Sequence, residues 1–210
     1  MKIVWLFPPA RKGEFQNISQ YRFTKRMKPN PFTRKSPSII YPYLAAMGVT
    51  QLSQEGHDVR FLDCPTMGYN WGKVHCEMLD VDLIVLEART PQMPMIWQVC
   101  KDLRAFDPSI KIALYGDHVT WNPAESLPYA DYIVKGGNYD VGILNLVEAL
   151  NGGLMGSNNV LEAPAMPILD KLPFCDRELV SWKKYYESWR NRDKFFWIMS
   201  MRGCLYRCIF

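Results

Sequence analysis

The chain has 210 residues, of which 48% are hydrophobic and 13% aromatic, which is enough to bury a sizeable core. No apolar run reaches the roughly 20 residues of a membrane span, and the N-terminus lacks a signal-peptide cleavage site. The formal net charge of +4 comes from one basic stretch rather than from the whole chain. These features exclude membrane-spanning and secreted classes and predict a cytoplasmic protein.

The basic stretch runs from Arg11 to Lys35, with eight Lys or Arg residues and one acid, Glu14. The rest of the chain carries 17 basic and 20 acidic residues. We interpret the stretch as a solvated loop, and the alternative is a lid or a contact for an anionic ligand group. Its aromatic residues follow no RNA-binding motif, so we expect no nucleic-acid partner.

Short apolar runs alternate with helical patterns along residues 1–150. The runs predict strands at 3–7, 58–63, 83–86, 110–115 and 132–135, and the patterns predict helices at 39–54, 74–79, 94–106, 123–129 and 141–150. This alternation predicts an α/β, Rossmann-like (flavodoxin-like) domain with a five-stranded parallel sheet flanked by helices. In such sheets the ligand lies at the carboxyl ends of the strands.

The remainder divides into a linker with a connecting helix, 151–194, and the start of a second domain, 195–210. The linker is first rich in Gly and Asn and then punctuated by proline. Residues 178–190 are predicted to form an amphipathic helix that packs on the main domain or on a missing one. The apolar run 195–200 predicts the first strand of another sheet.

The loops after the fourth and fifth predicted strands carry candidate binding residues. Gly116 and the pair Gly136-Gly137 permit positive φ and close approach of a bulky ligand, although ordinary strand-to-helix turns also favour glycine. His118 lies where a ligand would be, and it is either a ligand contact or a loop residue hydrogen-bonded to backbone. Other charged residues near strand ends show no spacing that places two on one face, so we interpret them as capping or solvated: Asp63, Glu87, Arg89, Asp117 and Asp140.

The six cysteines fall into two groups. Residues 64, 76, 100 and 175 are scattered and are interpreted as small buried apolar side chains. Cys204 and Cys208 lie four apart behind an Arg-Gly turn, and thiolates at short spacing are the usual ligands of iron–sulfur clusters. A Cys-x3-Cys pair by itself can also bind nothing.

The segment Met201–Phe210 resembles the Arg-Gly-Cys-x-x-x-Cys-x-Phe-Cys opening of radical S-adenosylmethionine (SAM) enzymes. Further segments resemble, in order and spacing, the N-terminal cobalamin-binding domain of one large subgroup. They are Tyr41–Ala46, Glu55–Val59, Arg89–Pro91, Gly116–Thr120, Ala130–Gly136 and Leu172–Arg177. The third cysteine of the pattern would be residue 211, so we expect a fragment truncated within the motif and inactive by itself.

The resemblance implies that the domain binds cobalamin and that Cys204 and Cys208 ligate a [4Fe-4S] cluster that cleaves SAM to a radical. Phe210 would lie against the adenine of SAM, and no catalytic residue is implied. The cobalamin would contact Thr90, Pro91, Gly116, Asp117, His118, Val119, Thr120, Gly136, Gly137, Asn138 and Tyr139. No Asp-x-His-x-x-Gly surrounds a histidine, so the cobalamin would have no protein imidazole below it, and Gly137 stands where the family often has Glu.

The resemblance favours a methyltransferase that moves a methyl group from methylcobalamin to an unactivated carbon of a small-molecule or peptide substrate. The alternative is a stand-alone corrinoid or other small-ligand binding module without catalysis. Neither reading requires a nucleic acid or a membrane span.

Overall fold

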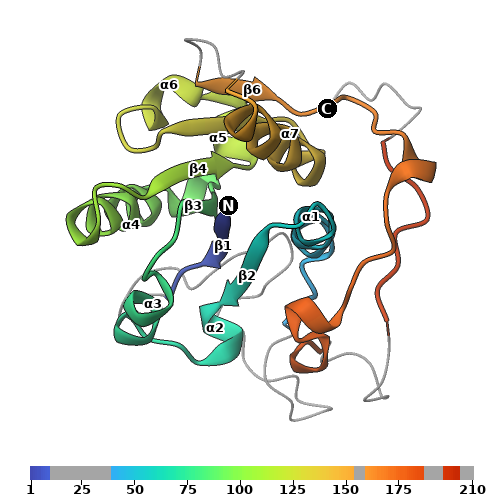
Figure 1. Ribbon diagram of the computed structural model, residues 1–210, viewed down its shortest axis with the longest axis horizontal. Helices are drawn as coiled ribbons and strands as arrows, with labels where there is room; N and C mark the ends of the chain where they lie inside the picture. Colours follow the sequence, from blue (N-terminus) through green and yellow to red (C-terminus); the bar gives the residue numbers. More distant parts are fainter. Residues whose placement is uncertain (10–38, 154–158, 187–195, 204–210) are drawn as a thin grey trace.

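A parallel six-stranded sheet forms the centre of the computed structural model, which describes residues 1–9, 39–153, 159–186 and 196–203 (Figure 1). The strands are β1 (Lys2–Phe7), β2 (Asp58–Asp63), β3 (Leu83–Glu87), β4 (Lys111–Tyr115), β5 (Tyr132–Lys135) and β6 (Val160–Glu162). Their order is β2-β1-β3-β4-β5-β6, and every neighbouring pair is parallel. The predicted α/β class with a parallel sheet is confirmed, and the arrangement is compatible with a Rossmann-like fold.

The prediction of five strands was wrong by one. β6 lies in the stretch interpreted as a linker, and it pairs with β5 at the edge of the sheet in the register Ile133 to Val160. Val160 and Leu161 are only partly buried, and Glu162 is exposed. Three residues are too few to show the alternation that identifies a strand in a sequence. The pairing of β6 depends on the neighbouring strand β5, which local sequence does not reveal.

Helices cover both faces of the sheet. α1 (Tyr43–Gln54) and α7 (Tyr139–Asn151) contact each other on one face, while α3 (Trp71–Glu77) and α4 (Met93–Phe106) cover the other (Figure 1). Each face has its own hydrophobic core. Alternate residues of β1 point to opposite faces, so Trp5 lies in the core beneath α1 and α7, and Leu6 lies in the core beneath α3 and α4. Short helices follow strand ends: α2 (Cys64–Met67), η1 (Thr90–Gln92), α5 (Asp117–Trp121) and α6 (Pro123–Ser126).

Local chemistry explains several helix ends. Asp63, at the end of β2, caps α2 by accepting a hydrogen bond from the Thr66 N–H at 3.3 Å, which confirms the capping interpretation for that residue. The carboxylate is fully buried and also accepts from the Tyr185 hydroxyl at 2.8 Å, so it is not solvated. Gly56 follows α1 with φ of +81°, the left-handed geometry that is common just after a helix end and that glycine adopts without strain.

The predicted helix at 178–190 is wrong within the described residues. Residues 178–186 form two 3-10 turns, η3 (Glu178–Val180) and η4 (Trp182–Lys184), separated by Ser181 with φ of +50°. Tyr186 makes two backbone hydrogen bonds to Ile39, at 2.8 and 3.0 Å. These long-range bonds take the place of helical ones, and tertiary context overrides local propensity. A third 3-10 turn, η2, spans Leu169–Lys171.

The predicted strand at 195–200 is likewise absent over the described part of that range. Residues 196–203 form no strand, and the apolar run instead lies against the start of α1, where Trp197 stacks on Tyr41 with ring centroids 5.3 Å apart. A strand needs a hydrogen-bonded neighbour, and residues 196–203 do not pair with either edge strand of the sheet, β2 or β6.

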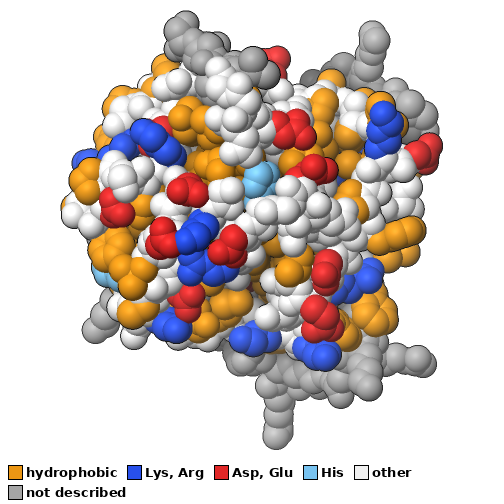
Figure 2. Space-filling model, viewed as in Figure 1, with side chains coloured by type: hydrophobic (Ala, Val, Ile, Leu, Met, Phe, Trp, Pro, Cys, Tyr) orange, Lys and Arg blue, Asp and Glu red, His pale blue; other side chains and the backbone are white. Residues whose placement is uncertain are grey.

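No helix of the described ranges is long and apolar enough to cross a bilayer. Acidic and basic side chains are interspersed on the face shown in Figure 2. The basic stretch 11–35 lies outside the described residues.

The four scattered cysteines differ in burial. Cys64, Cys100 and Cys175 are buried as predicted, but Cys76 is exposed, which corrects that interpretation. Burial raises the pKa of the Cys64 thiol and of the Cys100 thiol to about 12, and burial also raises that of Cys175.

We expect iodoacetamide at pH 8 to modify Cys76 at least about tenfold faster than Cys64 or Cys100, because only the thiolate reacts and burial suppresses both ionisation and access. Peptide mass spectrometry after a timed reaction measures this. Unfolding the chain in urea should equalise the three rates. Equal rates in the folded protein would contradict the burial pattern.

Candidate binding site at the carboxyl edge of the sheet

The strand order creates a crevice between the carboxyl ends of β1 and β3. The chain leaves β1 through α1 on one face of the sheet, and it leaves β3 through α4 on the other. The two connections therefore diverge at this point, which is where open parallel sheets bind their ligands.

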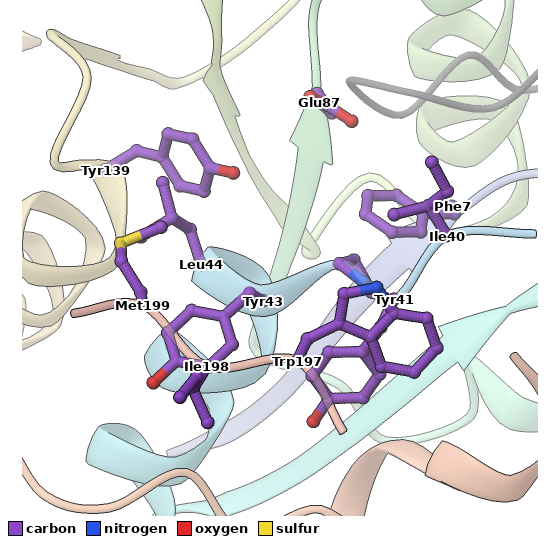
Figure 3. Close-up of a pocket in the computed structure, with 11 residues that line it drawn as sticks. Phe7, Ile40, Tyr41, Tyr43, Leu44, Glu87, Tyr139, Trp197, Ile198 and Met199 are labelled. Carbon is purple, nitrogen blue, oxygen red and sulfur yellow. The ribbon is translucent and has the colours of Figure 1, made fainter. Parts of the chain in front are cut away.

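A cavity of about 230 Å³ lies at that switch point (Figure 3). Phe7 ends β1, Glu87 ends β3 and Tyr139 begins α7, and all three line the cavity. Residues 40–44 before and within the first turn of α1 form one wall, and residues 197–199 form another. Most lining side chains are aromatic or aliphatic, so the cavity suits a flat apolar group.

One carboxylate enters this apolar lining. Glu87 is 6% exposed and accepts a hydrogen bond from Arg89 Nε at 2.8 Å, and an Asp117 oxygen lies 3.8 Å from Arg89 Nη2. Burial opposes the charge of Arg89, but Glu87 and Asp117 outweigh it and raise the pKa of the guanidinium. The interpretation of Glu87 as solvated was wrong. Residues 87 and 89 are two apart in extended chain, a spacing that places side chains on one side and could have revealed the pair.

Tyr139 provides another polar group of the cavity wall. Burial raises the pKa of its hydroxyl well above the usual value, and the Glu87 charge adds to that rise. Its ring lies 4.2 Å from that of Tyr115, centroid to centroid. The phenol therefore stays protonated and can donate a hydrogen bond to a ligand.

His118 lies beside the cavity region rather than in it. It belongs to the short helix α5, not to a loop as predicted, and is 7% exposed. Its Nδ1 lies 3.3 Å from Thr90 Oγ1, so the side chain contacts another side chain rather than backbone. Its Nε2 lies 3.3 Å from Glu125 Oε2 but lacks hydrogen-bond geometry, so it counts as an ion pair only if the ring is protonated.

Gly116 is required by the protein's own backbone. It has φ of +121° and ψ of −175°, and a Cβ there would lie 2.7 Å from the carbonyl oxygen of Ala88. The close approach occurs between two strand ends, and it requires glycine whether or not a ligand binds. The expected contact of Gly116 with a bulky ligand stays a prediction.

Replacing Gly116 by alanine should lower the free energy of unfolding by about 1–3 kcal/mol, because L-residues rarely adopt this geometry and the methyl group meets backbone. Urea unfolding measures the loss. Gly137→Ala is the matched control, since nothing lies within 4 Å of its added Cβ. Equal stability of the two variants would contradict this reading.

The loop after β5 lines a second cavity of about 410 Å³, together with residues 163–165 and 201–203. Gly136, Gly137 and Asn138 contribute from this loop. Thr120 ties it to α5, because its hydroxyl accepts from the Gly136 N–H at 3.0 Å and donates to the Gly116 carbonyl at 2.8 Å. Asn138 is fixed by donating to the carbonyls of Pro164 and Ala165, both at 3.0 Å.

The predicted cofactor-binding residues therefore separate into three places. Tyr139 lines the cavity at the switch point, Gly136–Asn138 line the second cavity, and the residues from 90–91 and 116–120 line neither of them. Prediction from the sequence missed Phe7, Tyr41, Glu87 and the wall at 197–199. Only the strand-end position of Glu87 carried a readable signal.

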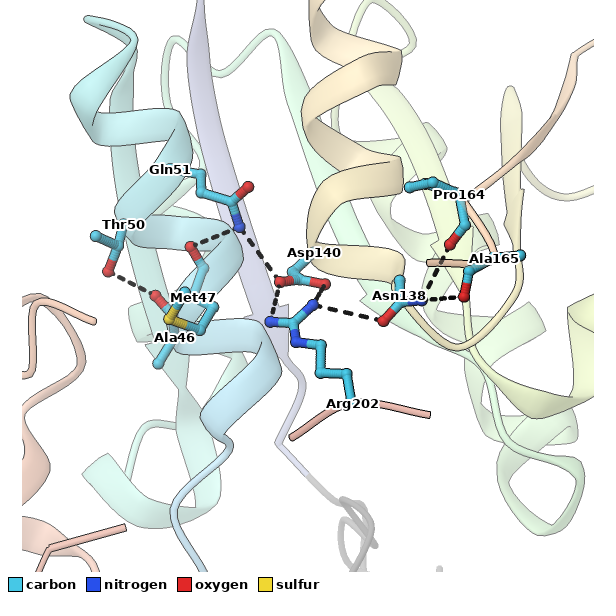
Figure 4. A network of polar contacts seen from close by, with 9 residues as sticks. All are labelled: Ala46, Met47, Thr50, Gln51, Asn138, Asp140, Pro164, Ala165 and Arg202. Atoms are coloured by element: carbon cyan, nitrogen blue, oxygen red, sulfur yellow. Dashed lines mark hydrogen bonds and ion pairs between the residues drawn. The ribbon is translucent and has the colours of Figure 1, made fainter. Parts of the chain in front are cut away.

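A buried ion pair joins the second cavity to α7 (Figure 4). Arg202 Nη1 and Nη2 donate to Asp140 Oδ1 and Oδ2 at 2.9 and 2.7 Å. Asp140 is fully buried and the Arg202 side chain is 7% exposed. Asp140 was interpreted as a capping or solvated residue, and its burial under a partner from distant sequence corrects this.

The predicted cluster ligands, Cys204 and Cys208, and the predicted SAM contact, Phe210, lie outside the described residues. The described ranges hold no group of three or more His, Cys, Asp or Glu residues able to bind a metal ion. Comparison with protein-family models, curated proteins and solved structures found no match to the chain.

Proposed function

We propose that the chain is the cobalamin-binding part of a radical SAM enzyme, with a methyltransferase favoured. One observation carries the proposal: the arginine of the Arg-Gly-Cys pattern, Arg202, is bound at the carboxyl edge of the parallel sheet by Asp140. The start of the cluster-binding pattern and the ligand edge of the domain are therefore adjacent. A shared site needs that proximity, because a methyl group and a radical must meet at one substrate.

The residues at the edge fit part of a cobalamin well. The cavity of about 230 Å³ is suited to one flat heteroaromatic group, such as the benzimidazole at the end of the cofactor's nucleotide tail. The corrin ring is much larger and would rest outside, near the exposed Thr90, Pro91 and Gly137. Tyr139 would donate a hydrogen bond to the tail, and Trp197 and Met199 would exclude water from it.

Each bound group would supply a distinct chemistry. Methylcobalamin supplies the methyl group, and a [4Fe-4S] cluster held by Cys204, Cys208 and a third ligand supplies the radical from SAM. The described residues would do the remaining work of binding and orientation. Arg89 balances the charge of Glu87, so the cavity presents little net charge to a neutral base.

Retention of hydroxocobalamin tests the proposal. The protein is mixed with excess corrinoid and passed through a gel-filtration column, and the visible spectrum of the protein peak is recorded. We expect retained corrinoid, and about tenfold weaker binding in Gly137→Trp, whose new ring would cover the open edge. The matched control is Glu148→Trp, an exposed position near the opposite end of α7. A colourless wild-type protein would refute the proposal.

The size of the cavity supports a second candidate, a binding module for a small aromatic ligand without catalysis. Native mass spectrometry with benzimidazole and with hydroxocobalamin separates the two. Binding of the small base with no retention of the corrinoid would favour the module.

A further inference from the structure

Residues 197–203, here called the strap, cross the carboxyl edge of the sheet between two anchors. At one end Trp197 stacks on Tyr41, with the rings 17° from parallel. At the other end Arg202 makes its two-pronged contact with Asp140. Between the anchors, Ile198 and Met199 form a wall of the switch-point cavity (Figure 3). The cavity therefore depends on where the strap lies.

The apolar side chains of the strap are too exposed to hold it in place. Ile198 is 79% exposed, Met199 is 41% exposed and Met201 is 72% exposed. Burial of apolar area is the usual force that fixes a segment, and here it is small. The placement of the strap consequently depends on its two anchors.

The Arg202 anchor has a defined geometry. The guanidinium fork matches the carboxylate, and Arg202 Nη1 also lies 3.5 Å from Asn138 Oδ1. Gln51 from α1 donates to Asp140 Oδ2 at 3.3 Å, so helices α1 and α7 both hold the carboxylate (Figure 4). A buried ion pair adds little stability compared with apolar residues of the same volume, but it specifies one arrangement.

We propose that Arg202 is a positioning residue, which latches the strap over the switch-point cavity through Asp140. Opening of this ion pair lets the ligand enter and leave, and its closure fixes the position of the strap up to Gly203. The latch itself follows from the contacts of the strap, while the identity of the ligand rests on the proposed function.

Trypsin cleavage measures how often the latch, the ion pair of Arg202 with Asp140, is open. The protease must take the Arg202 side chain into its own pocket before it cleaves the bond to Gly203. In the full chain, cleavage after Arg202 should be slow, since the guanidinium is paired and 7% exposed. Asp140→Asn should accelerate that cleavage by about tenfold or more, because the remaining contacts lack the charge-assisted pair. Cleavage after Lys183, whose side chain is 74% exposed, is the internal reference.

Two further variants keep the test decisive. Arg202→Lys keeps a trypsin site and the positive charge but loses the bidentate hydrogen bonding of the guanidinium. Its cleavage rate at residue 202 should lie between those of the wild type and Asp140→Asn. This variant replaces Asp140→Asn in the test if Asp140→Asn fails to fold. Lys135→Gln removes an ion pair with Glu162 at the surface and should leave cleavage after residue 202 unchanged. Wild-type cleavage after Arg202 as fast as after Lys183, or no acceleration in either latch variant, would overturn the proposal.

Bound corrinoid provides a second measurement, which would not change if Arg202 only stabilised the fold. Saturating hydroxocobalamin should slow wild-type cleavage after Arg202 by about tenfold, and Asp140→Asn should release the corrinoid about tenfold faster while association changes little. Bound corrinoid without protection of Arg202 would overturn the coupling to the cavity. If no corrinoid is retained, the proposed function fails, while the trypsin comparison still decides whether the latch exists.

Discussion

Arg202→Met should lower the free energy of unfolding by about 3 kcal/mol, because it breaks a buried ion pair beside the candidate site. The substitution leaves the Asp140 carboxylate fully buried without its cationic partner. The strap can lift and let water reach the carboxylate, which places the cost at the lower end of the range for broken buried pairs. Urea unfolding followed by tryptophan fluorescence measures the loss.

The double variant Arg202→Met/Asp140→Leu is the control for this result. It removes both charges and keeps similar volume, so most of the lost stability should return. Asp140→Leu alone should cost less than Arg202→Met, because the free arginine can turn into solvent. A double variant as unstable as the single Arg202→Met would contradict the view that an unpaired buried charge causes the loss.

Trp5→Ala should cost about 4 kcal/mol, because it empties the centre of the core on the α1 and α7 face. Trp5 is fully buried in β1, and its Nε1–H donates to the Tyr115 hydroxyl at 3.0 Å. Its ring also lies 6.4 Å from that of Tyr139, centroid to centroid. The substitution should therefore weaken ligand binding at the switch-point cavity as well as stability, and urea unfolding together with hydroxocobalamin titration measures both effects.

Gly48 in α1 supplies an internal check on the packing of Trp5. A Cβ at position 48 would lie 2.5 Å from Trp5 Cζ3, so Gly48→Ala alone should cost about 1–3 kcal/mol through overpacking. In the Trp5→Ala background the added methyl group has room, and the two costs should not add. If the losses from Gly48→Ala and Trp5→Ala are strictly additive in the double variant, the added methyl group does not clash with the indole ring of Trp5.

Much of the sheet was predictable from local pattern. Strands buried on both faces are continuous apolar runs, so Ile3–Phe7 and Leu83–Leu86 could be recognised without any tertiary information. Helix α4 was recognisable because its apolar residues repeat at helical spacing between a proline-rich start and Asp107.

The site was far less predictable, since its parts meet only in the folded chain. Asp140 and Arg202 are 62 residues apart, and neither shows in the sequence that it will be buried against the other. The same holds for Tyr41 and Trp197, which stack to close the cavity. Local patterns report which face of an element is apolar, but they do not report which distant segment covers it.

The amino-acid sequence by itself determined the α/β class, the alternation of strands and helices, and the edge at which a ligand should lie, because these depend on periodicity and chain direction. The tertiary structure alone decided that Gly116 serves a backbone contact, that His118 faces Thr90 and Glu125, and that residues 197–203 form a strap rather than a strand. The physical reason is that burial and pairing of polar groups depend on the partner, and partners are chosen by packing across the whole chain.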